Sequence, residues 1–320
     1  MKTMQAITNT GPGRLELRQF PLPEPGPGQA RIRTRAVAIC TTDLKMVAGW
    51  QRTGFPAIPG HEWCGTVDAL GPGADPGLLG RLCVGENVLP DGGEVGFEHP
   101  GGYGEFFLTE AGLLYPLPDD FPPTQGTLIE PLAVCLHGLA RLRRAPEEDA
   151  LVFGDGPIGL LMLLALRQSG PGRVALVGRQ PNRLALARWF GADPVIQDSA
   201  LAGGLDGEFP YLVEASGSPE ALAWAFRLAP RGGRILVLGD YDQERASFAW
   251  NDLLHRELEL VGSNASAEAW PEAVALAVTG DLPLDRLVTH RFPPAQFAEA
   301  IALTSHGKDQ CVKVVIEWPP

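Results

Sequence analysis

The sequence predicts an α/β protein with two domains, a barrel-like β domain and a doubly wound parallel sheet. Short alternating segments separated by glycine and proline fill the first 130 residues, and apolar strands alternate with helices from about residue 131 onward. The chain has 320 residues, of which 45% are hydrophobic and 20% charged, a composition typical of folded globular proteins. It is long enough to bury two hydrophobic cores.

The barrel-like domain is predicted from four short segments in which hydrophobic and polar residues alternate. Frequent turn signals separate them, as expected of strands that close a compact barrel. The proline-rich stretch at residues 20–29 is interpreted as a loop between strands, because strand-like sequence resumes directly after it. The four predicted strands cover residues 31–39, 62–70, 81–88 and 104–109.

The doubly wound sheet is predicted from the rhythm that begins at residue 131. A helix opens with Pro131, and apolar strands then alternate with helices. Near-continuous apolar strands of this kind belong to parallel sheets that are covered on both faces. The predicted strands are 150–153, 173–178, 194–197, 211–216, 234–239 and 258–262, with helices after 153, over 181–191 and over 219–228.

The C-terminal tail is predicted to return to the first domain. Residues after about 265 supply a helix, a strand-like segment at 286–292, another helix and a last strand at 311–318. This is too little sequence for a third core. The predicted domains are therefore residues 1–130 with 265–320, and residues 131–264.

The charge balance and the cysteines exclude several classes of function. The chain has 26 basic and 38 acidic residues, a net charge of −12, which argues against nucleic-acid or anionic-membrane partners because these need a basic face. The N-terminal segment lacks the apolar run of a signal peptide, and no apolar stretch is long enough to span a membrane, so we expect a cytoplasmic protein. Five scattered cysteines fit a reduced protein, and the absence of a C-x-x-C pair excludes an all-cysteine zinc site.

Residues 154–159, with the sequence GDGPIG, form a G-x-G-x-x-G motif between a predicted strand and a helix. In that context the motif indicates a dinucleotide site. Gly154 permits the tight turn, Gly156 lets the backbone approach the pyrophosphate, and Gly159 allows close packing of helix on strand. Pro157 and Ile158 open the helix whose N-terminus offers N–H groups to the phosphates. The alternative is a tight turn without a ligand.

The next predicted strand favours NADP over NAD. An NAD site usually carries Asp or Glu at this strand end to bind the ribose 2′-hydroxyl. Here the strand ends in Gly178 and Arg179, with Arg183 following, so two guanidinium groups could bind a 2′-phosphate. NAD stays possible, because the alternative is that both arginines are solvated surface charges.

Metal-binding side chains gather in the segment IPGHEWCGTV, residues 58–67. It brings His61, Glu62 and Cys64 within four positions, and each can hold a metal. Upstream, Cys40 precedes a predicted helix start, where the helix N-terminus would favour the thiolate that a metal requires. Downstream, Glu130 stands just before the helix that Pro131 opens. For His61 alone, a hydrogen-bonded histidine at a strand end is the alternative, and Cys64 is more commonly a buried core residue.

Together these motifs resemble the zinc-dependent medium-chain dehydrogenases, the family of alcohol, sorbitol and threonine dehydrogenases. The resemblance runs over nearly the whole chain, and the order and spacing of its motifs are specific. It implies a GroES-like β-barrel catalytic domain and a Rossmann domain. The motifs are C-x-T-D (40–43), G-H-E (60–62), E-P-L (130–132), the glycine motif, VEASG (213–217) and KVVI (313–316).

The resemblance implies that Cys40 and His61 bind a catalytic zinc. The third ligand stays open between Glu62, which is either a ligand or an exchanging neighbour, and Glu130, which stands where polyol and sugar dehydrogenases carry a glutamate. A catalytic zinc takes about three protein ligands and keeps a position for water or substrate. Zinc there acts as a Lewis acid, so that the alkoxide passes hydride to the nicotinamide more readily. Glu62 could also move protons.

Three residues of the helix after Cys40 receive roles through the same resemblance. Thr42 occupies the position of the hydroxyl that relays the alcohol proton, and Asp43 would orient His61 through its second ring nitrogen. Lys45 stands where many relatives carry a relay histidine, and a solvated helix lysine is its alternative. Residues 84–103 lack the usual four cysteines, so one catalytic zinc and no structural zinc are expected.

The leading hypothesis is a zinc-dependent oxidoreductase that transfers hydride between a secondary alcohol, of polyol or sugar type, and NADP(H). The alternatives are a zinc-free quinone or enoyl reductase of the same superfamily and a non-catalytic NADPH-binding protein. A small alcohol or carbonyl substrate and a homodimer or homotetramer are expected. The substrate itself stays open: Trp50, Trp63 and Tyr103 either line its pocket or belong to the barrel core.

Overall fold

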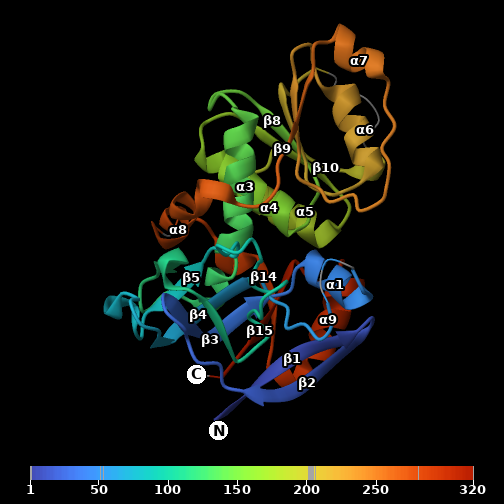
Figure 1. Cartoon of the computed structure of the whole chain (residues 1–320). Helices are drawn as coiled ribbons and strands as arrows, with labels where there is room; N and C mark the ends of the chain where they lie inside the picture. The colour runs from blue at the N-terminus through green and yellow to red at the C-terminus, as the bar shows by residue number, and fades with distance from the viewer. Residues whose placement is uncertain are drawn as a thin grey trace. The chain divides into compact units, whose positions relative to one another are not determined.

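Figure 1 presents the computed structural model of the chain, in which residues 2–50, 52, 54–200, 205, 207–279 and 281–319 are described. The described residues divide into two compact units. The first, called the barrel unit, comprises Met1–Glu130 and Trp270–Pro320; the second, called the nucleotide unit, comprises Pro131–Ala269. None of the helices in the described part is long and apolar enough to cross a membrane.

The barrel unit is built on an antiparallel sheet with one parallel pair at its edge. Its strand order is β14-β15-β3-β4-β5-β7, with β6 also paired to β3, and a separate β1–β2 hairpin accompanies it. The strands are β1 (Thr3–Gly11), β2 (Arg14–Pro21), β3 (Gln29–Ala38), β4 (Glu62–Leu70), β5 (Leu82–Gly85), β6 (Phe106–Glu110), β7 (Leu114–Pro116), β14 (Val288–Phe292) and β15 (Lys313–Glu317).

The centre of this sheet determines where the ends of three strands meet. Ala38, the last residue of β3, pairs with Glu62 of β4 on one side and with Val315 of β15 on the other. The first residues of β4 and β15 are therefore brought together at the end of β3, although more than 240 positions separate them in the sequence. Along most of β3, buried side chains alternate with half-buried ones. Successive side chains of a strand point to opposite faces, so one face of β3 packs on the core.

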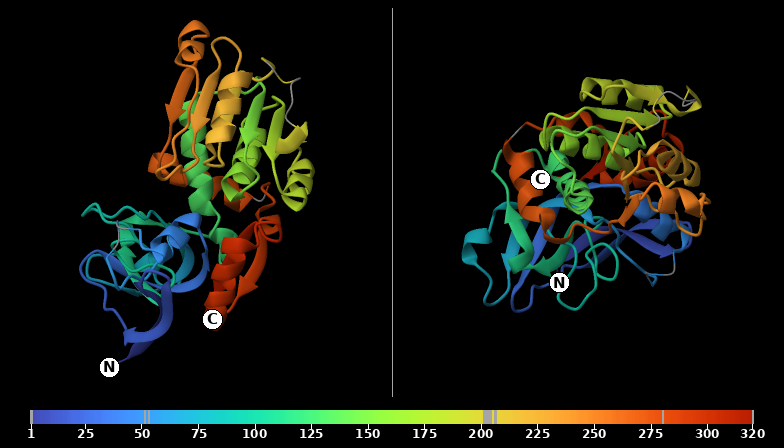
Figure 2. Two further views of the ribbon diagram at one scale, coloured as in Figure 1. Left: turned by 90° about the vertical axis from the view of Figure 1, so that its right-hand side faces the viewer. Right: turned by 90° about the horizontal axis from the view of Figure 1, so that it is seen from above.

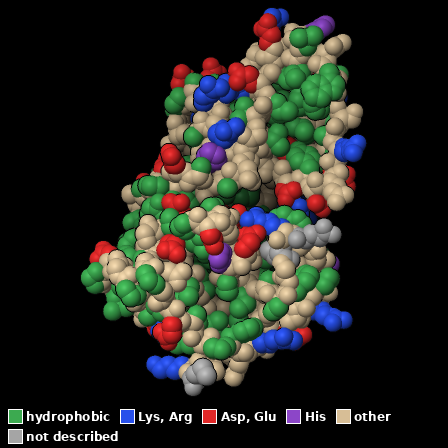
Figure 3. All heavy atoms as spheres, in the orientation of Figure 1, with side chains coloured by type: hydrophobic (Ala, Val, Ile, Leu, Met, Phe, Trp, Pro, Cys, Tyr) green, Lys and Arg blue, Asp and Glu red, His purple; other side chains and the backbone are tan. Residues whose placement is uncertain are grey.

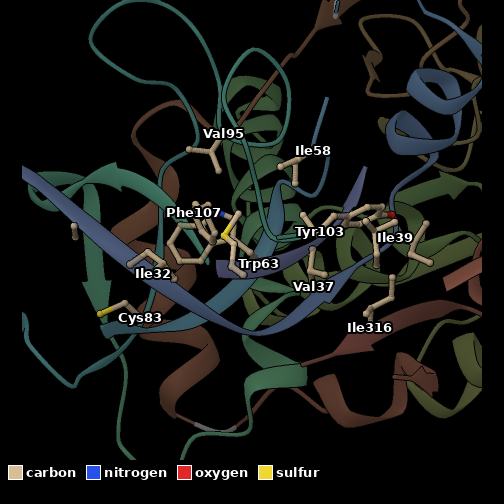
Figure 4. Close-up of a cluster of buried hydrophobic side chains, with 14 of the residues drawn as sticks. Ile32, Val37, Ile39, Ile58, Trp63, Cys83, Val95, Tyr103, Phe107 and Ile316 are labelled. Carbon is tan, nitrogen blue, oxygen red and sulfur yellow. The ribbon is translucent and has the colours of Figure 1, made fainter. Parts of the chain in front are cut away.

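The core of the barrel unit is a cluster of buried side chains (Figure 4). Trp63 of β4 and Phe107 of β6 meet edge to face, with ring centroids 4.9 Å apart. Tyr103 is fully buried in the same cluster with Val37. Of the aromatic residues that the sequence left open, Trp63 and Tyr103 therefore belong to the core, whereas Trp50 is 38% exposed.

The nucleotide unit contains a parallel sheet in the order β10-β9-β8-β11-β12-β13. The chain runs outward from β8 to β10 and then returns to β11 on the other side of β8. Right-handed crossovers place α4 and α5 on one face and α6 on the opposite face (Figure 2). This arrangement is the doubly wound α/β fold, and its direction of winding reverses between β8 and β11. The strands are β8 (Ala150–Phe153), β9 (Val174–Gly178), β10 (Val195–Gln197), β11 (Tyr211–Glu214), β12 (Arg234–Val237) and β13 (Glu259–Gly262).

The α/β architecture predicted from the sequence is confirmed. Four features were not predicted: the β1–β2 hairpin, the short strand β7 and the short helices α2 and α7. On the face in Figure 3, Lys and Arg side chains lie among Asp and Glu side chains rather than forming one basic band. The helices are α1 (Thr41–Ala48), α2 (Pro123–Gly126), α3 (Ile129–Leu142), α4 (Pro157–Gln168), α5 (Pro181–Trp189), α6 (Pro219–Leu228), α7 (Trp250–His255), α8 (Trp270–Thr279) and α9 (Phe297–His306).

Candidate metal and dinucleotide sites

The G-H-E segment turns sharply just before β4. Gly60 has φ +101°, a left-handed conformation that residues with a side chain rarely adopt. A Cβ at this position would lie 2.6 Å from Tyr103 Cδ1 and 2.9 Å from Val37 Cγ2, so the core also excludes one. Glycine is therefore required here, and the turn brings His61 and Glu62 to the start of the strand.

Three predicted metal-binding residues converge in the barrel unit. Ligand atoms of Cys40, His61 and Glu62 all lie within 4.8 Å of one another. Among the described residues, they form the one group of three or more potential metal ligands that lie this close together. His61 is 6% exposed and Glu62 is 1% exposed, while Cys40, the N-cap of α1, is half-buried. One sulfur, one imidazole and one carboxylate at this spacing form a donor set that fits zinc. Glu130 is not part of the group.

Asp43 of α1 faces the second ring nitrogen of His61. Its Oδ1 lies 3.4 Å from His61 Nδ1, and neither atom has a hydrogen bond of ordinary geometry to another described residue. Its Oδ2 accepts a hydrogen bond from the backbone N–H of Cys40 (2.9 Å), so one carboxylate orients two candidate ligands. His61 Nε2 is left for the metal. Burial alone would lower the pKa of His61, but Asp43 and Cys40 outweigh it and raise the pKa well above its ordinary value.

Lys313, the first residue of β15, forms a buried ion pair with Glu62. Its Nζ lies 2.8 Å from Oε1 and 2.6 Å from Oε2, and Lys313 is 3% exposed. Burial would lower the pKa of the ammonium group, but the charges of Glu62 and Cys40 raise it, so the lysine stays charged. Sequence reasoning missed this residue, because KVVI looks like the start of an ordinary apolar strand.

Glu130 lies close enough to the metal-binding group to respond to its charges. Burial raises the pKa of its carboxyl to about 7, with Glu62 acting in the same direction and His61 and Lys313 opposing it. Glu130 is half-buried and is the second residue of α3, where the helix N-terminus favours a negative charge. Glu130 therefore lies near Cys40, His61 and Glu62 but outside the group whose ligand atoms are within 4.8 Å of one another.

Three side chains support His61, and two of them, Asn87 and Phe97, were not singled out from the sequence. Asn87 Nδ2 donates a hydrogen bond to the backbone oxygen of His61 (2.9 Å), and Asn87 Oδ1 accepts one from the indole N–H of Trp63 (3.1 Å). The ring of Phe97 lies 4.9 Å from that of His61. Tyr103 donates to Asp43 Oδ2 over 3.4 Å. His61 is therefore supported at its backbone, at its ring and, indirectly, through Asp43.

The other predicted residues of the barrel unit differ in their surroundings. Thr42 Oγ1 lies 3.6 Å from Cys40 Sγ, which brings this hydroxyl next to the metal-binding group. Lys45 is half-buried one turn further along α1. Cys64 is fully buried, and burial raises the pKa of its thiol, which disfavours the thiolate that a metal needs.

The glycine motif lies at the carboxyl end of β8, where the winding direction of the sheet reverses. Gly156 is the N-cap of α4, which begins at Pro157 and continues through Ile158. A Cβ at Gly159 would lie 1.9 Å from the backbone oxygen of Gly154, so only glycine lets the helix approach the strand. Dinucleotides bind at such a reversal point in folds of this type.

The sequence places no carboxylate at the end of the second strand itself, but the fold brings one there from the glycine motif. Asp155 of the motif turns toward β9, and its Oδ2 accepts hydrogen bonds from the backbone N–H groups of Arg179 (2.8 Å) and Gln180 (2.6 Å). The carboxylate therefore comes from the neighbouring turn, because the parallel strands β8 and β9 end side by side.

Arg179 and Arg183, which the sequence suggested as ligands of a 2′-phosphate, both interact with other groups of the protein. Arg179 Nε lies 2.5 Å from Asp198 Oδ2, and its Nη2 lies 3.6 Å from Glu220 Oε2. Arg183 is 7% exposed and interacts within the protein.

A barrel unit with a cysteine–histidine–glutamate group, joined to a doubly wound nucleotide unit, is the architecture of a zinc-dependent dehydrogenase. Residues 26–119 match the family described as alcohol dehydrogenase GroES-like domain, and residues 157–279 match the zinc-binding dehydrogenase family.

Individual proteins agree with these matches. Erythritol/L-threitol dehydrogenase of Mycolicibacterium smegmatis is 30% identical and covers 97% of this chain and 96% of its own length. D-altritol 5-dehydrogenase of Agrobacterium fabrum is 31% identical, with 91% and 93% covered. A structure described as that of a zinc-binding dehydrogenase from Sinorhizobium meliloti 1021 bound to NADP has a TM-score of 0.93 at 27% identity, with 99% and 100% covered.

The chain belongs to the zinc-dependent medium-chain dehydrogenase family, among its alcohol, sorbitol and polyol dehydrogenases. It is an NAD(P)-dependent dehydrogenase that acts on CH–OH donors.

Proposed function

We propose that this chain oxidises a secondary alcohol of a polyol or sugar in a zinc-dependent reaction, with the barrel unit holding one zinc ion. The observation that carries this proposal is the convergence of Cys40, His61 and Glu62 within 4.8 Å. The donor set offers one soft sulfur, one nitrogen and one hard oxygen, which suits zinc and leaves a coordination position for a substrate oxygen. A zinc ion bound there would act as a Lewis acid and lower the pKa of the alcohol.

The surrounding residues have separate tasks in this proposal. Thr42, next to the Cys40 sulfur, relays the alcohol proton: its Oγ1 accepts that proton while the hydroxyl gives its own to the next group or to water. Lys45, further along α1, is the candidate for that next group, a role in which it takes the proton as the neutral amine. Lys313 neutralises Glu62 while it is buried, and Glu130, with its pKa near 7, can hold a proton or a water beside the group. The hydride leaves the alcohol carbon for the nicotinamide of the dinucleotide.

The polyol assignment draws on both the site and the relatives. Two carboxylates, Glu62 and Glu130, make the surroundings of the substrate oxygen polar and able to accept hydrogen bonds from neighbouring hydroxyl groups. The relatives reported above are named for erythritol, L-threitol and D-altritol, all of them polyols. A homodimer or homotetramer stays a prediction, for which the edge strand β13, with Leu260 43% exposed, offers a surface.

Removal of the metal is the experiment that tests this function. We expect about one zinc per chain by elemental analysis. A chelator should abolish the alcohol-dependent reduction of NAD⁺ or NADP⁺ across a panel of polyols, sugars and simple alcohols, and added zinc should restore it. Binding of the dinucleotide should survive chelation, because the glycine motif lies in the nucleotide unit. Full activity without zinc would instead favour a quinone or enoyl reductase. Zinc and dinucleotide binding without turnover on any alcohol would favour a non-catalytic protein.

Asp43→Asn should weaken zinc binding by about 10- to 100-fold, the scale found when the partner of a metal-bound histidine is lost. The amide can still accept from the Cys40 N–H, so the fold is preserved while the charge that faces His61 is removed. Competition with a chromophoric chelator measures the affinity. The matched control is Tyr103→Phe, which removes only a 3.4 Å contact to the same carboxylate and should change zinc binding little. Equal affinity in Asp43→Asn and the unmodified protein would contradict the orienting role.

A further inference from the structure

The nucleotide unit carries a carboxylate at the place that decides between NAD and NADP. In doubly wound folds, a carboxylate at the end of the second strand binds the ribose 2′-hydroxyl of NAD, and an arginine there accommodates the 2′-phosphate of NADP. In this chain the second strand ends at Gly178, and the side chain that reaches this point is that of Asp155.

Gly178 and Asp155 share one space. A Cβ added to Gly178 would lie 2.5 Å from Asp155 Cβ and 2.8 Å from its Oδ2. A side chain on residue 178 and the present position of Asp155 therefore exclude each other. The carboxylate at this place belongs to the turn after β8, and glycine at the end of β9 leaves room for it.

Two backbone donors and one guanidinium group near this point already have carboxylate partners. The backbone N–H groups of Arg179 and Gln180 both donate to Asp155 Oδ2, which leaves Oδ1 of the same carboxylate outside these two bonds. The guanidinium of Arg179 is paired with Asp198 and lies near Glu220. A phosphate would thus meet a fixed carboxylate with its donors committed elsewhere, whereas a hydroxyl would meet an acceptor.

We infer that Asp155 selects NAD(H) over NADP(H) by accepting a hydrogen bond from the ribose 2′-hydroxyl and repelling a 2′-phosphate. This inference rests on the proposed function only in taking the nucleotide unit to bind a dinucleotide. The sequence prediction of NADP is replaced by it, because that prediction assumed that the strand end had no carboxylate and that the arginines were available.

Binding of the reduced dinucleotides to the full-length protein tests the inference without any alcohol substrate. NADH and NADPH fluorescence titrations should give a Kd for NADPH that is about 30-fold or more above that for NADH, the scale of one like-charge contact at partial burial. Asp155→Asn keeps an oxygen for the Arg179 and Gln180 N–H groups but removes the charge. This variant should reduce the ratio of the NADPH Kd to the NADH Kd by about 10-fold, mainly because NADPH binds more tightly.

A second variant keeps the inference testable if Asp155→Asn folds poorly. Asp155→Ala combined with Gly178→Asp empties the turn and returns the carboxylate to the strand end. This double variant should recover the preference for NADH that Asp155→Ala alone loses. Arg179→Ala should change both Kd values by less than about 3-fold, as expected for an exposed side chain with surface ion pairs.

Several results would overturn the inference. Tighter binding of NADPH than of NADH by the unmodified protein would do so, as would an unchanged ratio in a folded Asp155→Asn protein. A loss of NADPH binding alone in Arg179→Ala would instead restore the guanidinium as the phosphate ligand. Binding of neither dinucleotide would overturn the proposed function together with the inference, whereas any of the other results leaves the proposed function intact.

Discussion

Cys40→Ser is expected to lower kcat/KM for the alcohol by on the order of 10³-fold and to reduce the bound zinc to a small fraction of one per chain. A serine hydroxyl is a poor zinc ligand at neutral pH, so the three-donor group would retain only His61 and Glu62. The fold should survive, because Cys40 is a half-buried N-cap and serine is a favoured residue at that position. Zinc content, kcat/KM and the thermal midpoint, measured on one preparation, separate loss of metal from loss of structure.

Cys64→Ala is the matched control for this experiment. Cys64 lies two residues beyond Glu62 on β4 but is outside the metal-binding group. Removing a buried sulfur should cost about 1 kcal/mol of stability and leave the zinc content unchanged. If Cys64→Ala lost its zinc while Cys40→Ser kept it, the identity of the sulfur ligand would have to be reassigned.

Lys313→Met is expected to destabilise the metal-free protein by about 3 to 5 kcal/mol, because it leaves the Glu62 carboxylate buried without its partner. Both side chains are almost fully withdrawn from water, so solvent cannot replace the lost interaction. The same change should tighten zinc binding, by about 10-fold, because the metal then becomes the main source of positive charge for Glu62. Urea unfolding of the metal-free protein and zinc competition titration measure the two effects.

The double variant Lys313→Met with Glu62→Gln shows whether the charge or the volume of the lysine matters. A neutral amide needs no buried countercharge, so the double variant should recover most of the stability that Lys313→Met loses. A double variant as unstable as Lys313→Met alone would mean that the lysine acts through packing. Its zinc affinity should be low, since Gln replaces a carboxylate ligand.

The sequence singled out candidate metal ligands where the signal was local, and three of them converge in the fold. The G-H-E turn, the N-cap position of Cys40 and the glycine motif are short patterns with a direct physical meaning, and the strands and helices around them follow hydrophobic periodicity. Lys313 could not be found this way. Its contact with Glu62 depends on β15 and β4 flanking β3, and the order of strands in a sheet is a long-range property that a local pattern does not contain.

The third ligand and the cofactor preference show the same limit. The sequence left the third ligand open between Glu62 and Glu130, and only the folded geometry brings Glu62 into the group with Cys40 and His61. Asp155 was overlooked because the carboxylate was sought after the second strand. An acidic residue inside the glycine motif, together with glycine at the strand end, is the pattern that could have indicated it.

X-ray absorption spectroscopy of the zinc-loaded protein is the most direct measurement of the proposed metal centre. We expect one sulfur scatterer at about 2.3 Å and the remaining ligands nitrogen or oxygen at about 2.0 to 2.2 Å. The sulfur contribution should disappear in Cys40→Ser and persist in Cys64→Ala. A zinc ion surrounded only by nitrogen and oxygen in the unmodified protein, or one with two or more sulfur ligands, would contradict a centre made by Cys40, His61 and Glu62.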